Sequence, residues 1–155
     1  MRIEEKIARL LKARKATLSV AESCSGGLLA DRLTNIPGSS DYFWLGLVTY
    51  HNKAKMKFLK IPASVLQQHG AVSEEVAVRM AKGVRRLLKT DFGIGITGIA
   101  GPGGGSKNKP VGLTFIAVAA SPKTCCVQYR FKGRRRKIKQ QAATQALQLL
   151  LKFLS

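Results

Sequence analysis

The chain has 155 residues, of which 45% are hydrophobic, and this length and composition are typical of one folded domain rather than of a disordered chain. No apolar run reaches the roughly 20 residues that a membrane-spanning helix needs, and the N-terminal residues lack the continuous apolar stretch of a secretory signal. Lys and Arg total 27 against 8 Asp and Glu, a formal net charge of +19, which attracts phosphates and other polyanions to the surface. We therefore expect a single domain over residues 1–155, cytoplasmic and not associated with a membrane.

The cysteine and histidine content argues against disulfides and against structural metal. The three cysteines are Cys24, Cys125 and Cys126, and an odd number with two adjacent members predicts reduced thiols. The two histidines, His51 and His69, have no companion at the spacing of a zinc site. We expect neither a metal nor a cofactor.

Helix and strand patterns alternate along the first 60 residues, judged by hydrophobic period and turn residues. In chain order they are an amphipathic helix marked by Ile3, Ile7, Leu10 and Leu11, a buried strand over 17–21, a polar turn over 22–27, a helix carried by Leu28, Leu29 and Leu33 that Pro37-Gly38 stops, a strand over 42–50, and a short helix through Leu59 for which Asn52 is the expected cap, after which Pro62 ends the region.

The second half continues the alternation and then adds a hairpin. Ser73 is a good N-cap for a helix that runs to about Lys89. The later elements are a strand over 92–97, a glycine loop over 98–106, two strands over 111–119 and 125–131 joined around Pro122, and a closing helix marked by Ile138, Ala142, Ala146, Leu149, Leu150 and Phe153. This order predicts one α/β domain with helices on both faces of a mixed sheet.

The glycine loop invites a phosphate-binding interpretation, because exposed backbone N–H groups can cradle an anion. It lacks the Gly-Lys-[Ser/Thr] ending of a P-loop, since Lys107 is followed by Asn108, and it leads into a strand rather than a helix. A surface turn is the alternative interpretation. The chain also has no Gly-x-Ser-x-Gly elbow, so any serine chemistry must be assembled from separated segments.

Four sequence blocks in this order and spacing closely resemble the CinA C-terminal domain family, also known as nicotinamide-nucleotide amidohydrolase. They are AESCSGG (21–27), PGSS (37–40), VTYHNKAK (48–55) and GIAGPGG (98–104), with HGAVSE (69–74) between the last two. The similarity extends from about residue 3 to residue 154. Any one block alone is weak evidence, whereas their joint order is specific.

The resemblance implies an amidase that converts nicotinamide mononucleotide to nicotinate mononucleotide and ammonia, without an obligatory metal. It also implies a three-layer α/β/α sandwich with a mixed sheet, a single amidohydrolase domain over residues 1–155, and commonly a homodimer. The expected partner is therefore a small nucleotide substrate, together with a second copy of the chain.

Amide hydrolysis needs a nucleophile, a base that activates it, and donors for the oxyanion. No Cys/His or Ser/His pair is evident, so a serine and a neutral lysine are the expected catalytic pair. The family pattern places the nucleophile at Ser40 and the lysine at Lys55. Lys55 can act as a base only if its pKa falls well below about 10.4, which burial and a neighbouring cation such as Arg135 would both favour. The alternatives are a turn or cap serine and a solvated helix lysine.

Further residues match family positions around this pair. Ser23 and Tyr50 are assigned to catalysis through hydrogen bonds near the pair or the carboxamide, with Tyr50 able to shuttle a proton. Ser39 and Thr97 are assigned to substrate binding. Gly26 and Gly27 are as well, because they begin a helix, where an anion is favoured; helix-start packing is the alternative.

Arg135 matches the arginine of the family's Gly-Asp-Arg block and is expected to hold the nucleotide phosphate. The block reads Gly-Arg-Arg-Arg over 133–136, so its acidic neighbour is replaced and Arg134 or Arg136 could take the role instead. Positive side chains at a helix start oppose the helix dipole, and a bound phosphate would relieve that cost. Glu22 also matches the family and is interpreted as a structural hydrogen-bond acceptor.

The second hypothesis is a non-enzymatic protein that binds nucleic acid or a protein partner through its basic surface. Nucleic-acid binding needs a reading element besides charge, and no zinc finger, RNP1-like strand, KH-type loop or basic zipper occurs in the sequence. The match of Ser23, Ser40, Tyr50 and Lys55 favours the enzyme, since a binding protein does not need them. A related amide or nucleotide as the substrate is a third alternative.

Overall fold

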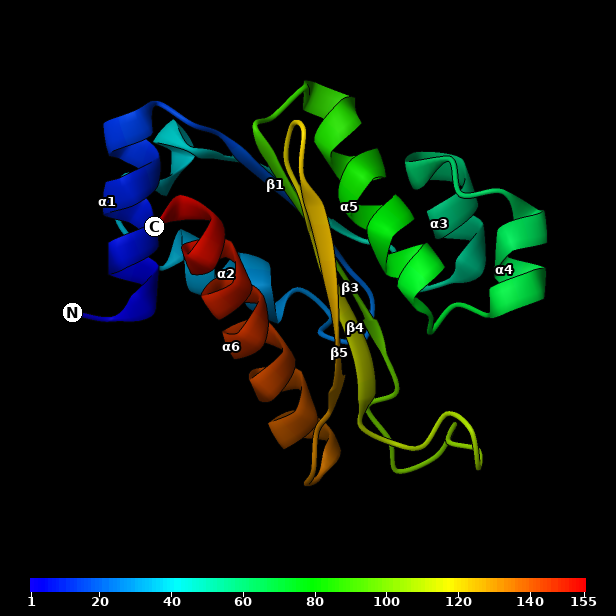
Figure 1. The fold of residues 1–155 in the computed structure, drawn as a ribbon. Helices are drawn as coiled ribbons and strands as arrows, with labels where there is room; N and C mark the ends of the chain where they lie inside the picture. Colours follow the sequence, from blue (N-terminus) through cyan, green and yellow to red (C-terminus); the bar gives the residue numbers. More distant parts are fainter.

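The computed structural model describes all 155 residues and contains five strands, six α-helices and one short 3-10 helix (Figure 1). In chain order they are α1 (Ile3–Arg14), β1 (Leu18–Glu22), α2 (Leu28–Thr34), η1 (Ser39–Asp41), β2 (Phe43–Val48), α3 (Asn52–Leu59), α4 (Ala63–His69), α5 (Glu74–Leu88), β3 (Phe92–Gly98), β4 (Leu113–Ala119), β5 (Thr124–Arg130) and α6 (Arg135–Leu154). No helix combines the length and the apolar character that crossing a membrane requires.

The five strands form one mixed sheet in the order β2-β1-β3-β4-β5. β1 pairs in parallel with both β2 and β3, whereas β4 is antiparallel to β3 and to β5. Helices α1, α2 and α6 cover one face of this sheet, and α3, α4 and α5 lie on the other (Figure 1). The predicted α/β class and the three-layer arrangement are therefore confirmed.

Helix α5 lies unusually close to β3, and two glycines permit this approach. Gly93 and Gly95 alternate along β3 on the face toward α5, and a Cβ at either position would collide with backbone carbonyls of Ala81 and Ala77. The alternating glycines in the β3 sequence are therefore explained by the close packing of α5 on this strand.

Two local features differ from the sequence-based expectation. Residues 63–69 form α4, where Pro62 was expected to end the region; proline is acceptable there because it precedes the first helical residue. The helix α3 is capped by the His51 side chain, which accepts a hydrogen bond of 3.0 Å from the Lys53 N–H, whereas Asn52 was the expected cap. The Ser73 cap of α5 is confirmed by its 3.3 Å hydrogen bond from the Val76 N–H.

The topology determines where functional groups gather. The chain leaves β1 toward β2 by way of α2 on one face, and returns from β2 to β3 by way of α3, α4 and α5 on the other. The carboxyl end of β1 is therefore a topological switch point, the place where ligands bind in open parallel α/β sheets. The loops after β1, β2 and β3 meet at this edge.

Candidate active site

Lys55 is the buried cation of this edge. It lies in the first half of α3 with only 1% of its surface exposed. Its Nζ lies 3.0 Å from the Ser23 Oγ, 2.6 Å from the Thr49 carbonyl oxygen and 3.0 Å from the Tyr50 carbonyl oxygen. These three acceptors match the three N–H donors of an ammonium group. Together the three hydrogen bonds fix the position of the Lys55 nitrogen.

Burial lowers the pKa of Lys55 from 10.5 to about 8, because the charged form loses its hydration. A substantial fraction of the amine is then neutral near physiological pH. The neutral amine keeps two N–H donors for the Thr49 and Tyr50 carbonyls and directs its lone pair toward Ser23. The arrangement can therefore accept a proton from the Ser23 hydroxyl.

Ser23 is held in place by the chain on both sides of it. Its N–H donates to the Ile96 carbonyl of β3 at 2.9 Å, which extends the pairing of β1 with β3 by one residue. Just before it, the buried Glu22 carboxylate accepts hydrogen bonds of 2.9 Å from the Leu29 and Ala30 N–H groups at the start of α2. Glu22 therefore ties the strand to the helix, as interpreted from the sequence.

Ser40 does not lie near Lys55 within one chain. Ser39 and Ser40 belong to η1, before β2 begins, and Lys55 follows the end of β2. Six strand residues at about 3.3 Å each separate the two sites by about 20 Å. The turn that contains Ser40 instead contacts α1, since Asp41 forms an ion pair of 3.7 Å with Lys12. Ser40 and Lys55 therefore do not meet within one chain, and the hydroxyl that reaches Lys55 in this structure is that of Ser23.

Tyr50 and Arg135 form a second contact at the same edge. The Arg135 guanidinium donates to the Tyr50 hydroxyl at 2.8 Å and to the Gly101 carbonyl at 2.7 Å. Tyr50 is 56% exposed, so its ring stands at the mouth of the site while its carbonyl binds Lys55. Arg135 thus connects the start of α6, the loop after β2 and the glycine loop. Burial is the cause that lowers the Lys55 pKa, and Arg135 does not contribute to it.

Thr97 closes the site on the side of β3. Its buried hydroxyl donates to the Ala71 carbonyl at 2.8 Å, which holds the segment between α4 and α5 against the carboxyl end of β3. Lys109, which follows the glycine loop, donates to the carbonyl of His69 at the end of α4 at 2.5 Å. The glycine loop and this segment therefore act as one wall, and Thr97 has a structural partner in addition to its expected role toward the substrate.

Two buried hydroxyls at this edge have no hydrogen-bond partner within the chain: those of Ser25 and Thr49. Ser25 follows Ser23 by two residues, in the turn that continues through Gly26 and Gly27, and both glycines adopt positive φ. Buried polar groups are normally hydrogen-bonded, so these two hydroxyls are exceptions within the site. The sequence gives no separate signal for these two residues. They lie in the blocks over 21–27 and 48–55, where the family pattern assigns roles to Ser23, Tyr50 and Lys55.

The neighbouring Cys24 does not present a thiolate. Burial raises its pKa to about 12, so the thiol stays protonated and is a poor nucleophile at neutral pH. No group of three or more His, Cys, Asp or Glu side chains is placed to hold a metal ion. The hydroxyl within hydrogen-bond distance of the buried Lys55 amine is that of Ser23.

Comparison with known proteins identifies relatives over the full chain. The model of the CinA C-terminal domain matches residues 1–154. A CinA-like protein of Syntrophus aciditrophicus is 51% identical over 154 residues, and a protein of Moorella thermoacetica whose name places it among the competence-damage inducible proteins is 55% identical over 152 residues. These alignments cover 99% and 98% of this chain but 37% of each relative, so the chain spans little more than a third of their length.

Solved structures show the same fold. The crystal structure of a competence/damage inducible protein from Agrobacterium tumefaciens has 37% identity and a TM-score of 0.93, covering 100% of this chain and 98% of that one. The crystal structure of a competence or damage-inducible protein from Enterobacter asburiae has 31% identity and a TM-score of 0.95, covering 99% and 96% respectively.

Proposed function

The chain belongs to the CinA C-terminal domain family, and we propose that it hydrolyses the carboxamide of nicotinamide mononucleotide to give nicotinate mononucleotide and ammonia. The observation that carries the proposal is the buried contact between Lys55 Nζ and Ser23 Oγ at 3.0 Å, with the pKa of Lys55 lowered to about 8. A serine beside a neutral amine is one arrangement of nucleophile and base that can cleave an amide.

Acylation begins with the neutral Lys55 amine. It accepts the Ser23 proton as Oγ attacks the carboxamide carbon, which forms a tetrahedral intermediate. The resulting Lys55 ammonium then gives its proton to the amide nitrogen, the C–N bond breaks, and ammonia leaves. The product of this half-reaction is an ester between Ser23 and the pyridine carboxyl group.

Deacylation uses the same amine in the reverse direction. Lys55 takes a proton from water, the hydroxide attacks the ester carbonyl, and the proton returns to the Ser23 oxygen as the C–O bond breaks. The product leaves as a carboxylic acid that loses its remaining proton to solvent, and Lys55 is neutral again. Burial matters in both halves, because a solvated lysine would remain charged at neutral pH.

Main-chain donors are available for the developing oxyanion. The N–H groups of Cys24 and Ser25 donate to no other group of the chain, and both directly follow Ser23. Backbone donors next to the nucleophile are a common source of oxyanion stabilisation. Tyr50, held by Arg135, stands at the mouth of the site, where it can contact the pyridine ring or the ribose.

The direct test is ammonia release from nicotinamide mononucleotide by the purified chain, measured together with nicotinate mononucleotide by chromatography. The proposal expects equal amounts of the two products. Absence of turnover by the unmodified protein, under conditions where it binds the nucleotide, would contradict the amidase assignment and favour a binding role.

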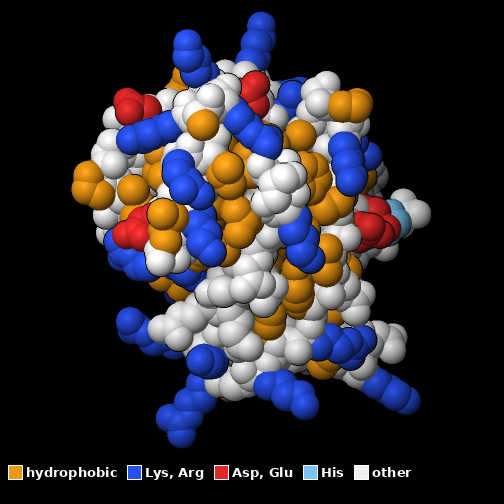
Figure 2. All heavy atoms as spheres, turned by 60° about the vertical axis from the view of Figure 1, so that its left-hand side comes forward, with side chains coloured by type: hydrophobic (Ala, Val, Ile, Leu, Met, Phe, Trp, Pro, Cys, Tyr) orange, Lys and Arg blue, Asp and Glu red, His pale blue; other side chains and the backbone are white.

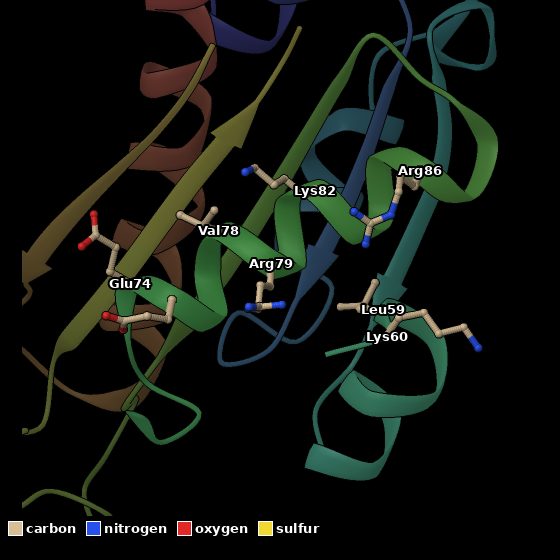
Figure 3. Close-up of a pocket in the computed structure, with 8 residues that line it drawn as sticks. Leu59, Lys60, Glu74, Val78, Arg79, Lys82 and Arg86 are labelled. Atoms are coloured by element: carbon tan, nitrogen blue, oxygen red, sulfur yellow. The ribbon is translucent and has the colours of Figure 1, made fainter. Parts of the chain in front are cut away.

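The second candidate function is polyanion binding through the basic surface, and one groove favours it. Lys and Arg dominate the charged side chains on the face seen in Figure 2. On the opposite helical layer, α5 and the end of α3 enclose a groove of about 440 Å³ (Figure 3). Arg79, Lys82 and Arg86 line it from one face of α5, and none of them lies within 4.0 Å of a carboxylate. Lys60 adds a fourth cation, whereas Glu74 and Glu75 at the start of α5 place two carboxylates in the same lining.

Salt dependence tests this candidate. If the groove binds nucleic-acid phosphates, the affinity for a fluorescent oligonucleotide should fall steeply as salt is raised. The double variant Arg79→Gln/Lys82→Gln should then reduce the slope of log affinity against log salt concentration by about 0.9 per lost phosphate contact. Lys137→Gln/Lys152→Gln is the charge-matched control outside the groove. Equal effects of both pairs would mean that only the net charge attracts the oligonucleotide.

A further inference from the structure

His51 stands where the candidate active site meets the start of α3. It lies directly before this helix and directly after Tyr50, whose carbonyl binds Lys55. The His51 imidazole accepts a hydrogen bond of 3.0 Å at Nδ1 from the Lys53 N–H. The His51 carbonyl accepts hydrogen bonds from the N–H groups of Ala54 at 3.0 Å and of Lys55 at 3.3 Å. One residue therefore holds three N–H groups of the first turn of α3.

The start of α3 has no acidic side chain to support it. The helix is only eight residues long, and Lys53 places a cation in its first turn, which opposes the helix dipole. The longer α5 shows the contrast, because its Ser73 cap is followed by Glu74 and Glu75. Short helices depend on capping and on tertiary packing. The His51 imidazole is therefore the side chain that stabilises this helix start.

The same stretch of main chain holds both ends of Lys55. The Lys55 N–H donates to the His51 carbonyl. The Lys55 Nζ donates to the carbonyls of the two preceding residues, Thr49 and Tyr50. If the first turn of α3 opens, the Lys55 backbone moves relative to these carbonyls and to the Ser23 hydroxyl, which lies 3.0 Å from Nζ. The cap at His51 and the buried position of the Lys55 amine are therefore linked.

The cap depends on the protonation state of His51. Nδ1 accepts a hydrogen bond only while the imidazole is neutral and carries its proton on Nε2. The side chain is exposed, and imidazole is the side chain that changes charge between about pH 5 and 8. Protonation removes the acceptor and adds a cation near Lys53 and Lys55. The neighbouring α6 contributes a further cation, since Arg135 donates to the Tyr50 hydroxyl, and no carboxylate lies within 4.0 Å of the imidazole.

We propose that neutral His51 is a positioning residue for Lys55, and that protonation of His51 releases the start of α3 and lowers turnover in acid. The inference rests on the proposed function, since it concerns the base of that reaction. His51 touches no reacting atom in this mechanism, because its effect passes through the first turn of α3. It adds a second titrating group to the pH dependence expected from Lys55.

Three variants separate the cap from other roles of the side chain. His51→Ala removes the acceptor, whereas His51→Asn keeps an N-cap acceptor that does not titrate. Asn52 takes no part in the cap, so Asn52→Ala is the matched control at the next position. At pH 8, His51→Ala should lower kcat for nicotinamide mononucleotide by about tenfold with KM little changed, since loss of a cap has an effect of this order. His51→Asn and Asn52→Ala should stay within a few-fold of the unmodified chain.

The pH profile provides a readout that a purely structural role would not move. Below pH about 8, protonation of Lys55 alone lowers kcat/KM about tenfold per pH unit. Protonation of His51 should steepen this fall in the unmodified chain, whereas His51→Asn should keep the tenfold slope. With both normalised at pH 8, the unmodified chain should be about tenfold less active than His51→Asn at about pH 5.5. Equal slopes would overturn the proposal, and this comparison does not require His51→Ala to fold.

Titration of the Lys55 amine tests the link without turnover. In the complete chain isotope-labelled at the lysine Cε, the NMR signal that disappears in Lys55→Met reports this amine. Its pKa should be about 8 in the unmodified chain and in His51→Asn. In His51→Ala it should rise toward 10.5, because the amine becomes solvated. An unchanged titration in folded His51→Ala would contradict the positioning role.

The outcomes keep the two proposals apart. If nicotinamide mononucleotide is not hydrolysed but the Lys55 titration changes in His51→Ala, the positioning role stands and the amidase assignment fails. If hydrolysis occurs and His51→Ala matches Asn52→Ala in kcat and in the Lys55 titration, the amidase assignment stands and the positioning role is wrong.

Discussion

Lys55 and Ser23 are 32 residues apart in the sequence, and their side chains meet at 3.0 Å between Nζ and Oγ. The parallel pairing of β1 with β2 produces this contact, because it brings the residues that follow both strands to one edge of the sheet. The Thr49 and Tyr50 carbonyls hold the amine from the other side. The contact therefore depends on the register of two strands rather than on a local motif.

Replacing Ser23 should abolish amide hydrolysis, while replacing Ser40 should not. We expect Ser23→Ala to lower kcat by about a thousandfold or more, since loss of a nucleophile has effects of this order or greater. Ser40→Ala, whose hydroxyl lies at the other end of β2, should retain turnover within a few-fold. Ammonia release by both variants decides the matter, and the reverse order would restore Ser40 as the nucleophile.

The rate of hydrolysis should depend on the protonation state of Lys55. With its pKa lowered to about 8, kcat/KM for nicotinamide mononucleotide should rise with pH and level off above about pH 8, because only the neutral amine accepts the Ser23 proton. A profile measured from pH 6 to 9.5 provides the test. A flat profile over that range would be inconsistent with a lysine base.

The same pKa predicts a pH-dependent stability. Between pH about 8 and 10.5 the unfolded chain carries a proton on Lys55 that the folded chain has lost, so the free energy of unfolding rises with pH over this window. The gain relative to Lys55→Met should approach about 3 kcal/mol, because folding lowers the pKa of Lys55 from 10.5 to about 8. Urea unfolding of both proteins at several pH values measures it, and parallel curves would disprove it.

Arg135 and Tyr50 should act as one unit. Arg135→Gln removes the donor to the Tyr50 hydroxyl and to Gly101, and Tyr50→Phe removes the acceptor. Because the two share one hydrogen bond, the effects on kcat/KM should be smaller in the double variant than the product of the single effects. Independent, multiplicative effects would show that the contact has no role in turnover.

The packing of α5 on β3 should be sensitive to one methyl group. Gly95→Ala places a Cβ against the Ala77 carbonyl and the Met80 Cβ, and overpacking of this kind costs about 1–3 kcal/mol. Gly103→Ala is the matched control, since no atom lies within 4 Å of its Cβ position. Denaturant midpoints compare them; similar stability of the two variants would mean that α5 can move away from the sheet.

Most of the architecture follows from local patterns in the sequence. Alternating helix and strand patterns gave the α/β class, the Ser73 cap and the hairpin around Pro122, because each depends on local period and turn chemistry. It also identified Lys55, Tyr50 and Ser23 as candidate site residues through their blocks. Local patterns do not predict α4, because a proline between two short apolar segments favours the end of a helical region over the start of a new helix.

The tertiary structure alone decided which hydroxyl meets Lys55. Ser40 is closer than Ser23 to Lys55 along the chain, yet the intervening strand extends about 20 Å and carries the two apart. Ser23 arrives from another strand, and the burial that lowers the Lys55 pKa arises where three loops and two helical layers converge. The separation of Arg135 from Arg136, one bound to Tyr50 and the other facing a hollow with Lys139, likewise follows from helix direction. These are through-space relationships set by strand register and helix packing.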